Sequence, residues 1–447
     1  MTHCPQSFAI LLLCACSLLS CESKTQSEAL DEELLLDEDG SAPEVDTVDL
    51  LDEQGEELEL EEEQSAPLAC AERLTLHRNF ELAEADPDIQ IHASLAFDGD
   101  LIWLAYNLPD QEGSSGFDTY LRRLACDGSP VEEALAVHPV STDNETDPCV
   151  AVGPEQALVV WMRDNKAAPR NLDIVYRLFD RDAKALGEPR RLPLMLEGSV
   201  LDANAWMPTC AALPDGSFAV AGTVALEGSF RAFVQRLDAN GEAQGGLSLA
   251  DAEAGDFDQR PSLAASEDAS LALGFARERG ESPSQLYVAQ LPAGSSASSI
   301  PVELAMPEHF GNSIALSDSA QGLMIGVGTE LEGDSSVLVR PLANAELVQT
   351  LGRSGRIDHS PALASGADLL GVFYYRVRSG IRNDVVVQGL GYDGTAFQVR
   401  PEFVVPTTEP AGPYGAALVH ISGRAFFAAW SEGVSPNFRL MGRFVEL

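Results

Sequence analysis

The chain has 447 residues and a formal net charge of −42 at pH 7, with 70 Asp and Glu against 28 Lys and Arg. Nucleic-acid binding requires a basic surface that neutralises phosphates, so this composition excludes a nucleic-acid partner. Residues 22–68 hold 19 Asp and Glu against one Lys, a charge of −18 that leaves −24 on the rest of the chain. The acidity is therefore concentrated in one segment near the N-terminus.

The chain begins with a predicted export signal. Residues 8–19 are an apolar run, too short to span a bilayer but typical of the h-region of a signal peptide. The run ends in Leu18-Leu19-Ser20-Cys21. This tetrapeptide resembles the lipobox of bacterial lipoproteins, which implies a signal peptide at residues 1–20 and lipidation of Cys21. The alternative is an ordinary secretory signal with an incidental Cys21. We expect a lipid-anchored protein of the bacterial cell envelope, in the outer membrane or at the cell surface.

The segment after the signal is predicted to be a disordered acidic linker, residues 21–68. Residues 31–39 and 50–63 alternate acids with Leu but lack aromatic residues and basic partners. Such a segment cannot bury enough surface to fold, so it would act as a spacer between the membrane and the folded domain. Calcium binding by its acids is an alternative, although the ligand spacing of an EF-hand loop is absent. No other cofactor is predicted.

The remaining chain, residues 69–447, is built from repeats. In the clearest copy, residues 147–183, three β-branched and aromatic runs closed by turn residues predict three antiparallel strands. The second strand recurs at residues 101–106, 157–162, 217–224, 270–277, 322–329, 369–376 and 425–432. The third strand recurs at residues 117–124, 172–179, 230–237, 284–291, 335–342, 383–390 and 438–445. Seven such copies, at a period of roughly 50 to 55 residues, predict an all-β fold, a seven-bladed β-propeller of four-stranded antiparallel blades.

The two ends of the repeat region are predicted to share a blade. The seventh copy has predicted strands at residues 415–421, 425–432 and 438–445 and no outer strand after them. Residues 71–78 precede the first copy and are predicted to supply that strand, which would close the ring and cover an exposed edge. The inner strand of the first blade is then predicted at residues 90–97.

The cysteines are consistent with an exported domain. After the predicted signal and Cys21, four remain, Cys70, Cys126, Cys149 and Cys210, and four cysteines allow three pairings. Cys149 and Cys210 follow equivalent prolines of neighbouring copies, whereas Cys70 and Cys126 belong to the last and first blades. We therefore favour the bridges Cys149–Cys210 and Cys70–Cys126. Four buried free thiols are the alternative.

The sequence contains no strong catalytic motif. The nucleophile elbow, the paired-histidine zinc helix, the phosphate-binding loop and the CxxC pair are absent, so no catalytic residue and no metal site is predicted. Asp147, Asp258 and Asp358 precede innermost strands, where loops of several blades would converge. The ordinary role of such Asp side chains would be to hydrogen-bond backbone N–H groups in turns and at the ends of strands. Their functional role would be a cation or polar-ligand site at the mouth of the ring.

Residues 69–447 resemble secreted bacterial propellers built from imperfect repeats, which include sialidase-like and kelch-like rings. The resemblance rests on an inner-strand Pro and on Asp/Gly turns such as Cys126-Asp127-Gly128. The Ser-x-Asp-x-Gly-x-Thr-Trp box of sialidases is absent, and Tyr392-Asp393-Gly394-Thr395 is only a fragment of it. The resemblance therefore implies an architecture and no named enzyme family.

The sequence is consistent with two functions, one of a binding protein and one of an enzyme. The first is a monomeric, non-enzymatic surface lipoprotein whose ring displays loops that bind a protein or glycan partner. The alternative is a divergent glycoside hydrolase or polysaccharide lyase, which requires two carboxylates about 5 to 10 Å apart across a cleft. The residues considered for such a cleft are Glu330, Glu332, Asp334, Asp358 and Arg376.

Overall fold

The computed structural model describes residues 70–76, 78–85, 92–109, 116–138, 143–165, 171–251, 253–280, 282–295, 302–304, 310–331, 334–352, 357–377, 383–407, 416–434 and 437–447. The chain divides into two units, Met1–Gln64 and Ser65–Leu447, and all described residues belong to the second. The predicted signal peptide, Cys21 and nearly all of the predicted linker lie in the first unit, and the whole of both segments lies outside the described residues. Among the described residues, no helix has the length and apolar character needed to cross a membrane.

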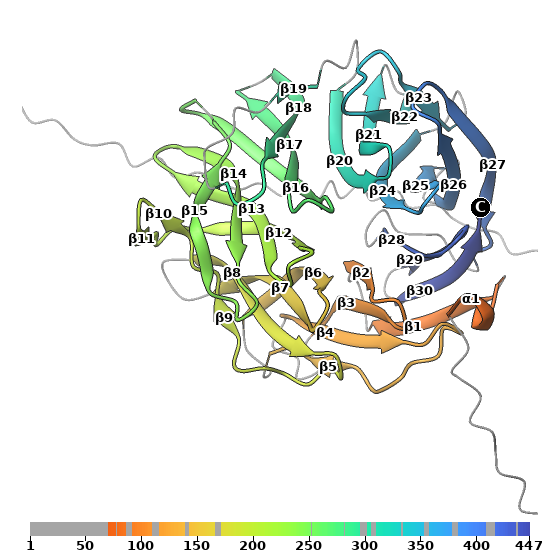
Figure 1. Ribbon diagram of the computed structural model, residues 1–447, viewed down its shortest axis with the longest axis horizontal. Helices are drawn as coiled ribbons and strands as arrows, with labels where there is room; N and C mark the ends of the chain where they lie inside the picture. The colour runs from red at the N-terminus through yellow and green to blue at the C-terminus, as the bar shows by residue number, and fades with distance from the viewer. Residues whose placement is uncertain are drawn as a thin grey trace, which may run out of the picture. The chain divides into compact units, whose positions relative to one another are not determined.

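The described residues fold almost entirely into antiparallel sheets of four strands (Figure 1). The first three sheets are β2 (Ala93–Phe97), β3 (Ile102–Pro109), β4 (Phe117–Leu124) and β5 (Leu135–Ala136); β6 (Asn144–Val152), β7 (Gln156–Asn165), β8 (Asn171–Asp180) and β9 (Arg190–Arg191); and β12 (Ala205–Ala212), β13 (Phe218–Leu226), β14 (Ser229–Leu237) and β15 (Ala243–Leu249). The small hairpin β10 (Met195–Leu196) and β11 (Ser199–Val200) lies between the second and third sheets in the sequence.

The later sheets repeat this order. They are β16 (Asp256–Ala265), β17 (Leu271–Arg279), β18 (Ser282–Leu291) and β19 (Val302–Glu303); β20 (Phe310–Ser319), β21 (Gly322–Leu331), β22 (Asp334–Pro341) and β23 (Gln349–Leu351); β24 (Ile357–Ser365), β25 (Leu370–Val377), β26 (Asn383–Tyr392) and β27 (Phe397–Val405); and β28 (Ala417–Ser422), β29 (Ala425–Val434) and β30 (Asn437–Glu446) with β1 (Asn79–Ala85). The one described helix is α1 (Cys70–Arg73).

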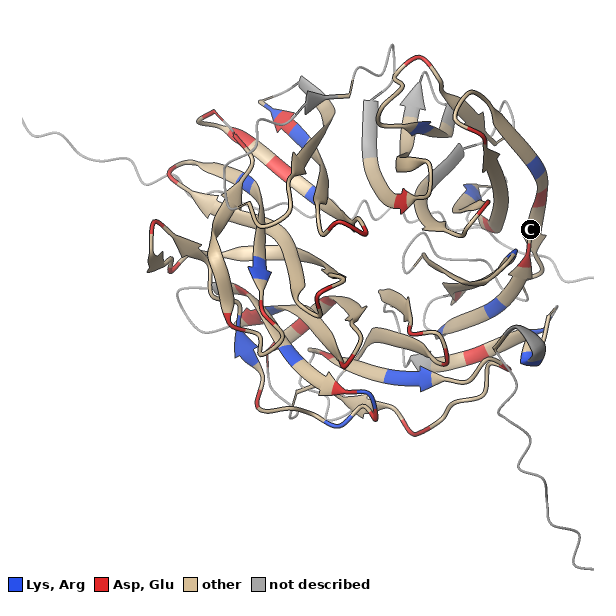
Figure 2. Cartoon of the chain, viewed as in Figure 1, with Lys and Arg blue, Asp and Glu red and all other residues tan. Residues whose placement is uncertain are grey.

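The core lies between neighbouring sheets. In β7, the consecutive residues Leu158, Val159, Val160 and Trp161 are all fully buried. A strand covered on both faces can carry apolar residues without alternation, which explains why the second strands were the clearest part of the repeat. Trp161 packs with Trp103 of the preceding sheet in one apolar cluster. Many of the Asp and Glu residues lie instead in turns and near strand ends (Figure 2).

The sheets are arranged around a common centre, with their first strands innermost (Figure 1). Each first strand contacts the first strand of the next sheet, and β2 contacts both β6 and β28. Single parallel residue pairs, Phe230 with Phe257 and Ser335 with Ile357, link neighbouring sheets. This is the arrangement of a β-propeller, so the predicted all-β propeller fold of four-stranded antiparallel sheets is confirmed.

An N-terminal strand joins the last sheet, but the prediction that it comprises residues 71–78 is wrong. Residues 70–73 form α1, and β1 pairs antiparallel with β30, with Phe80 opposite Gly442. The Ala-Glu-Arg sequence of α1 favours a helix. By contrast, Phe80 and Leu82 alternate with polar residues, as in a half-buried strand, and Leu82 is buried. β2 begins at Ala93, and residues 86–91 of the region before it lie outside the described part of the chain.

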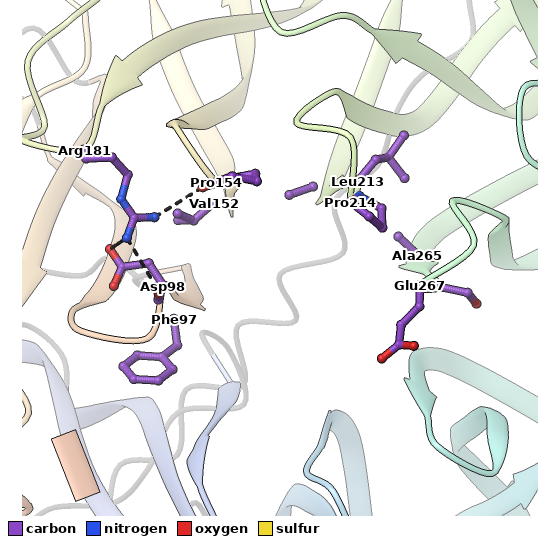
Figure 3. A pocket seen from close by; sticks show the side chains of 12 residues that line it. Phe97, Asp98, Val152, Pro154, Arg181, Leu213, Pro214, Ala265 and Glu267 are labelled. Atoms are coloured by element: carbon purple, nitrogen blue, oxygen red, sulfur yellow. Dashed lines mark hydrogen bonds and ion pairs between the residues drawn. The ribbon is translucent and has the colours of Figure 1, made fainter. Parts of the chain in front are cut away.

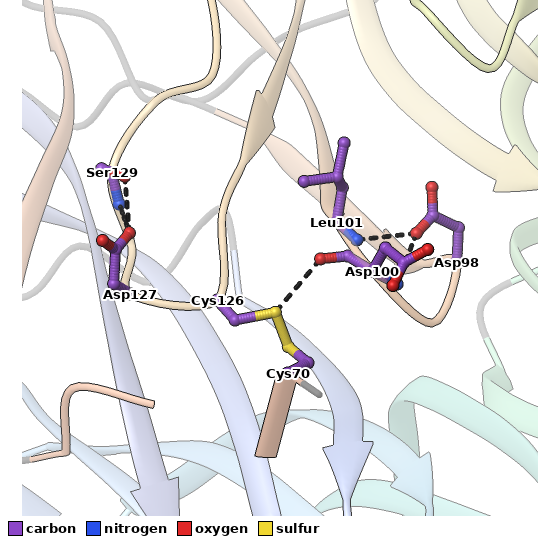
Figure 4. The surroundings of a disulfide bond; sticks show 7 residues. All are labelled: Cys70, Asp98, Asp100, Leu101, Cys126, Asp127 and Ser129. Atoms are coloured by element: carbon purple, nitrogen blue, oxygen red, sulfur yellow. Dashed lines mark hydrogen bonds between the residues drawn. A yellow bond between two sulfur atoms is a disulfide. The ribbon is translucent and has the colours of Figure 1, made fainter. Parts of the chain in front are cut away.

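Two disulfides connect neighbouring sheets, and both are the predicted pairs. Cys70 of α1 bonds to Cys126 in the turn after β4, with a Cα–Cα distance of 5.3 Å (Figure 4). Cys149 of β6 bonds to Cys210 of β12, with a Cα–Cα distance of 5.9 Å. Each bond therefore joins elements that are 56 or 61 residues apart, about one repeat.

Candidate functional site

The first strands run in one direction, which gives the centre of the propeller two distinct ends. Six of them lead into turns that together line two neighbouring hollows. We call this the turn end; its turns contain Asp98, Gly153, Leu213, Ser266, Ala320 and Gly366. The same strands begin at the opposite end, which we call the bulge end because five of them are bulged there.

The first hollow at the turn end has a volume of about 460 Å³. Its walls combine apolar turn residues, among them Phe97, Val152 and Pro214, with one ion pair (Figure 3). Arg181 lies 2.9 Å from the carboxylate of Asp98 and also donates a hydrogen bond of 3.2 Å to the carbonyl of Gly153. The positive charge of this hollow is therefore already neutralised.

Asp98 is fixed by further hydrogen bonds. Its carboxylate accepts from the indole Nε1 of Trp103 at 2.7 Å and from the backbone N–H groups of Asp100 and Leu101. Its side chain is only 2 % exposed. Asp98 thus holds the turn after β2 in place and positions Arg181 at the wall of the hollow.

The second hollow is larger, about 790 Å³, and shares Ala265, Ser266 and Glu267 with the first. Its other polar lining residues are Asp268, Ser270, Asp318, Ser319, Ser365 and His420. The hydroxyls of Ser317 and Ser365 lie 2.7 Å apart. The described lining of this hollow contains three carboxyl groups and no Lys or Arg.

Two of these carboxyl groups have pKa values shifted in opposite directions. Burial raises the pKa of Asp318, a hydrogen bond from the hydroxyl of Ser266 opposes that shift, and the negative charges of Asp268 and Glu267 add to it. The pKa of Asp268 is lowered by hydrogen bonds from the hydroxyl and backbone N–H of Ser270. Groups whose environments separate their pKa values in this way are suited to act as an acid and its ionised partner.

At the bulge end, the predicted site residue Asp147 is partly exposed. Its Oδ1 lies 2.9 Å from Nδ1 of His92, and the side chains of His92 and Asp147 are 39 % and 28 % exposed. His92 comes directly before β2 and Asp147 lies in β6, so the pair bridges two neighbouring sheets. The sequence indicated Asp147 as a candidate site residue but did not indicate His92.

Asp258 is fully buried and its carboxylate is occupied. Arg277 approaches it at 2.5 and 2.9 Å, and the backbone N–H of Ala232 in the preceding sheet donates to it at 3.0 Å. Burial raises the pKa of Asp258, against the opposing effect of Arg277. These contacts tie β16 to β14, as Glu145 ties β6 to β4 through the N–H of Thr119.

Of the remaining predicted positions, only Arg376 has a described side chain, and it lines neither hollow. Asp358 is opposite Arg376 in the β24–β25 ladder, and its side chain lies outside the described residues. Arg376 is 1 % exposed and forms two hydrogen bonds with Glu402, at 2.7 and 2.9 Å. Of the other residues considered for a cleft, Glu330, Glu332 and Asp334 also have no described side chain.

The carboxyl groups of the larger hollow were missed from the sequence. Asp268 and Asp318 are one repeat apart and close the first strands of consecutive copies, at Ser-Glu-Asp and Leu-Ser-Asp. That spacing was a usable signal, because equivalent turns of neighbouring blades meet at one end of a propeller. Among the described residues, no group of three or more His, Cys, Asp and Glu side chains is arranged to hold a metal ion.

No protein-family model and no curated protein matches the sequence. Among solved structures, the chain is similar to the polysaccharide lyase Uly1 (11 % identity, 84 % of this chain and 92 % of that chain, TM-score 0.53). It is also similar to a PL25 ulvan lyase bound to a -[GlcA(1-4)Rha3S]- saccharide (9 %, 81 % and 95 %, TM-score 0.50). A further match is the β-propeller domain of the trilobed protease from Pyrococcus furiosus (8 %, 82 % and 96 %, TM-score 0.47). At these identities, what the chain shares with the two lyases is the propeller-like fold.

Proposed function

We propose that the protein binds a polysaccharide at the turn end and hydrolyses it there. The observation that carries this proposal is the pair Asp318 and Asp268, which line one hollow with pKa values shifted in opposite directions. Glycoside hydrolysis uses such a pair, one carboxyl group protonated as the acid and the other ionised as nucleophile or base. Asp318 takes the role of the acid, and Asp268 that of the ionised partner.

The fold supports an enzyme more than the non-enzymatic binding module predicted first. Both solved structures with a TM-score of at least 0.50 reported above are of polysaccharide lyases. Because the identities are 11 % and 9 %, this similarity supports a polysaccharide as the class of substrate and leaves the reaction to be argued from the site.

Hydrolysis is favoured over elimination by the charges of the site. A lyase removes a proton beside the carboxylate of a uronic acid, and that carboxylate must be neutralised by a cation. Arg181 is the only Lys or Arg in the described lining of the two hollows, and it is already paired with Asp98. The negative charge of the domain also repels a polyanion. We therefore propose a neutral polysaccharide as the substrate.

The test is a reducing-end assay with neutral polysaccharides, run across pH. Asp318→Asn should lower kcat by about 100-fold or more, because general acid catalysis contributes about 10² to 10⁴ in rate. Wild-type activity should fall as the pH rises through the raised pKa of Asp318, since the acid must be protonated. An unsaturated, ultraviolet-absorbing product would identify elimination instead.

The matched control is Asp215→Asn. Asp215 occupies the same turn position in its sheet as Asp268 does in the next one. Like Asp268, it accepts hydrogen bonds from the serine two residues ahead, Ser217, but it lines neither hollow. Its variant should keep full activity, whereas Asp268→Asn should lose it. If the protein binds a polysaccharide saturably but cleaves none, it is a non-enzymatic binding module and the proposal of hydrolysis is wrong.

We also propose that residues 69–447 form a monomeric seven-bladed ring closed by β1. The seven recurrences of the second and third strands in the sequence support the blade count. The pairing of β1 with β30, and the contacts of β2 with both β6 and β28, support the closure. Closure in this way would leave no unpaired strand between the first and last blades.

For the location, we propose a lipid anchor at Cys21 in the bacterial envelope, with residues 21–68 as the spacer. Each buried methylene of an acyl chain adds about 0.8 kcal/mol to membrane binding. Cys21→Ser should abolish labelling by a fatty-acid analogue and leave the precursor unprocessed at Ser20. A wild-type protein that takes up no label and fractionates with the soluble proteins would contradict the anchor.

A further inference from the structure

The first strands share an unusual backbone feature at the bulge end. Asp147, Met207, Arg260 and Ser360 each have a φ between 51° and 55° and each precedes a proline. At every one of these positions the ladder to the second strand skips a residue, so the pair forms a β-bulge. Proline is tolerated at a bulge because no ladder hydrogen bond is needed there.

The left-handed conformation at these bulges is uncommon for residues with a Cβ, because the Cβ approaches the following carbonyl oxygen. Glycine adopts it freely, and this chain uses glycine at turns such as Gly99 and Gly216. At the four bulges it retains Asp, Met, Arg and Ser. Non-glycine residues held in such conformations cluster at functional sites, which indicates that the side chains are kept for a purpose.

Three of these residues, Asp147, Met207 and Arg260, lie on the neighbouring first strands β6, β12 and β16. His92 lies directly before β2, the neighbour of β6 on the other side. We call these four residues the arc. His92 and Asp147 are 2.9 Å apart, and the backbone N–H of Arg260 donates to Sδ of Met207 at 3.3 Å. β6 and β12, between these two contacts, are joined by the disulfide Cys149–Cys210 just beyond their bulges. The bond stiffens the backbone that carries the arc, as a preorganised site requires.

Three half-buried aromatic side chains lie beside the arc. Trp206 precedes Met207, and its ring centroid is 5.3 Å from that of Phe230, which in turn is 5.0 Å from that of Phe257. Phe257 lies on β16, the strand that carries Arg260. Large amphipathic rings next to polar side chains supply both apolar contact and hydrogen bonds.

We infer that this arc is a second binding site, separate from the turn end, for one ring of a neutral sugar. The apolar face of the sugar would lie on Trp206 and Met207, and its hydroxyls would bond to Arg260 and to the His92–Asp147 pair. Within the arc, the positive charge of Arg260 is balanced by the negative charge of Asp147, and the domain around it is strongly acidic. The arc therefore does not favour a polyanionic ligand. The left-handed bulges hold the contributing side chains toward the ligand.

Tryptophan fluorescence tests this inference directly. Trp103, Trp161 and Trp430 are fully buried, so Trp206 is the tryptophan that a ligand can reach. Neutral cello-, xylo- and malto-oligosaccharides are titrated into the full-length protein, with Trp206→Phe to assign the signal. At least one should give a saturable change, and Asp147→Gly and Arg260→Gly should weaken it tenfold or more without lowering the melting temperature, because glycine relieves the strained backbone.

The matched control is Glu197→Gly, since Glu197 also has a positive φ, 49°, but lies in the β10–β11 turn. This variant should bind as the wild type does. The inference is overturned if no neutral oligosaccharide changes the signal, if oligogalacturonate binds more tightly, or if the two bulge variants bind normally. Asp318→Asn should leave the Trp206 signal intact, which separates this site from the proposed hydrolytic one.

Discussion

At the scale of single residues, many aspartates of the folded domain serve its turns. Asp180 and Asp238 each accept two backbone N–H groups from the residues two and four positions ahead. Asp127 accepts the backbone N–H and the hydroxyl of Ser129. Asp393 accepts the N–H and the hydroxyl of Thr395 and the N–H of Ala396. This is the ordinary turn chemistry of Asx side chains, and it accounts for part of the acidity outside residues 22–68.

These turns predict a specific sensitivity to acid. The pKa of Asp127 is lowered by the hydroxyl and N–H of Ser129, and that of Asp393 by the N–H and hydroxyl of Thr395. A depressed folded pKa stabilises the protein above the unfolded pKa, about 3.9, and the contribution is lost as the pH falls through the folded value. The urea midpoint of the wild type should therefore fall more steeply below about pH 4 than that of Asp127→Asn/Asp393→Asn. Parallel curves for the two proteins would contradict this role.

At the scale of elements, β1 protects the outer edge of β30. It pairs with β30 from Asn79 to Ala85 and buries Leu82 against the last sheet. α1, in contrast, pairs with no strand; it is bonded to the turn after β4 by the Cys70–Cys126 disulfide and lies against β28. The two adjacent elements should therefore contribute very differently to folding.

Two truncations separate these contributions. A chain that begins at residue 86 should aggregate and lose cooperative thermal unfolding, because the edge of β30 is exposed. A chain that begins at Asn79 keeps β1 and should still unfold cooperatively. It should lose the contribution of one disulfide, about 2 to 4 kcal/mol, together with the packing of Leu74 and Leu76 against the core. Full-length protein with Cys70→Ala/Cys126→Ala is the control for the second truncation. If the shorter chain melts as cooperatively as the longer one, β1 does not stabilise the last sheet.

At the scale of the whole molecule, a disulfide adds a covalent link between sheets that are held otherwise by side-chain packing and by a few hydrogen bonds. Cys149–Cys210 closes a segment of 61 residues between two first strands. Cross-linking distant parts of a chain restricts mainly the unfolded state, and the effect grows slowly with loop length. This bond should therefore stabilise the domain as a whole as well as stiffen the bulge end.

Removal of this bond is the corresponding prediction. Cys149→Ala/Cys210→Ala should lower the free energy of unfolding by about 2 to 4 kcal/mol, measured by chemical denaturation. Peptide mapping of the exported wild type without reduction should recover Cys149 joined to Cys210. Equal stability of variant and wild type under oxidising conditions would show that the bond contributes nothing to the domain.

The sequence by itself determined the second and third strands of each copy and their order, and it favoured the two disulfide pairs. Apolar runs such as residues 157–162 are local signals, and turn residues close them at each end; repetition then makes a weak local signal reliable. The cysteines could be paired because their offsets from equivalent prolines were visible in neighbouring copies. In a repeat protein, equivalent positions of several copies can thus be compared within one chain, which a single strand does not allow.

Only the tertiary structure decided which side chains meet. Asp318 and Asp268 come together because turns of consecutive sheets converge at one end, and the shift in the pKa of Asp318 depends on burial that no local pattern records. The left-handed bulges follow from how first strands curve around the centre, and Asp147 was identified without its partner His92. β1 was misplaced by a few residues because its position depends on pairing with β30, more than 350 residues away. Local periodicity specifies strands, whereas contacts between distant residues depend on the packing of the whole domain.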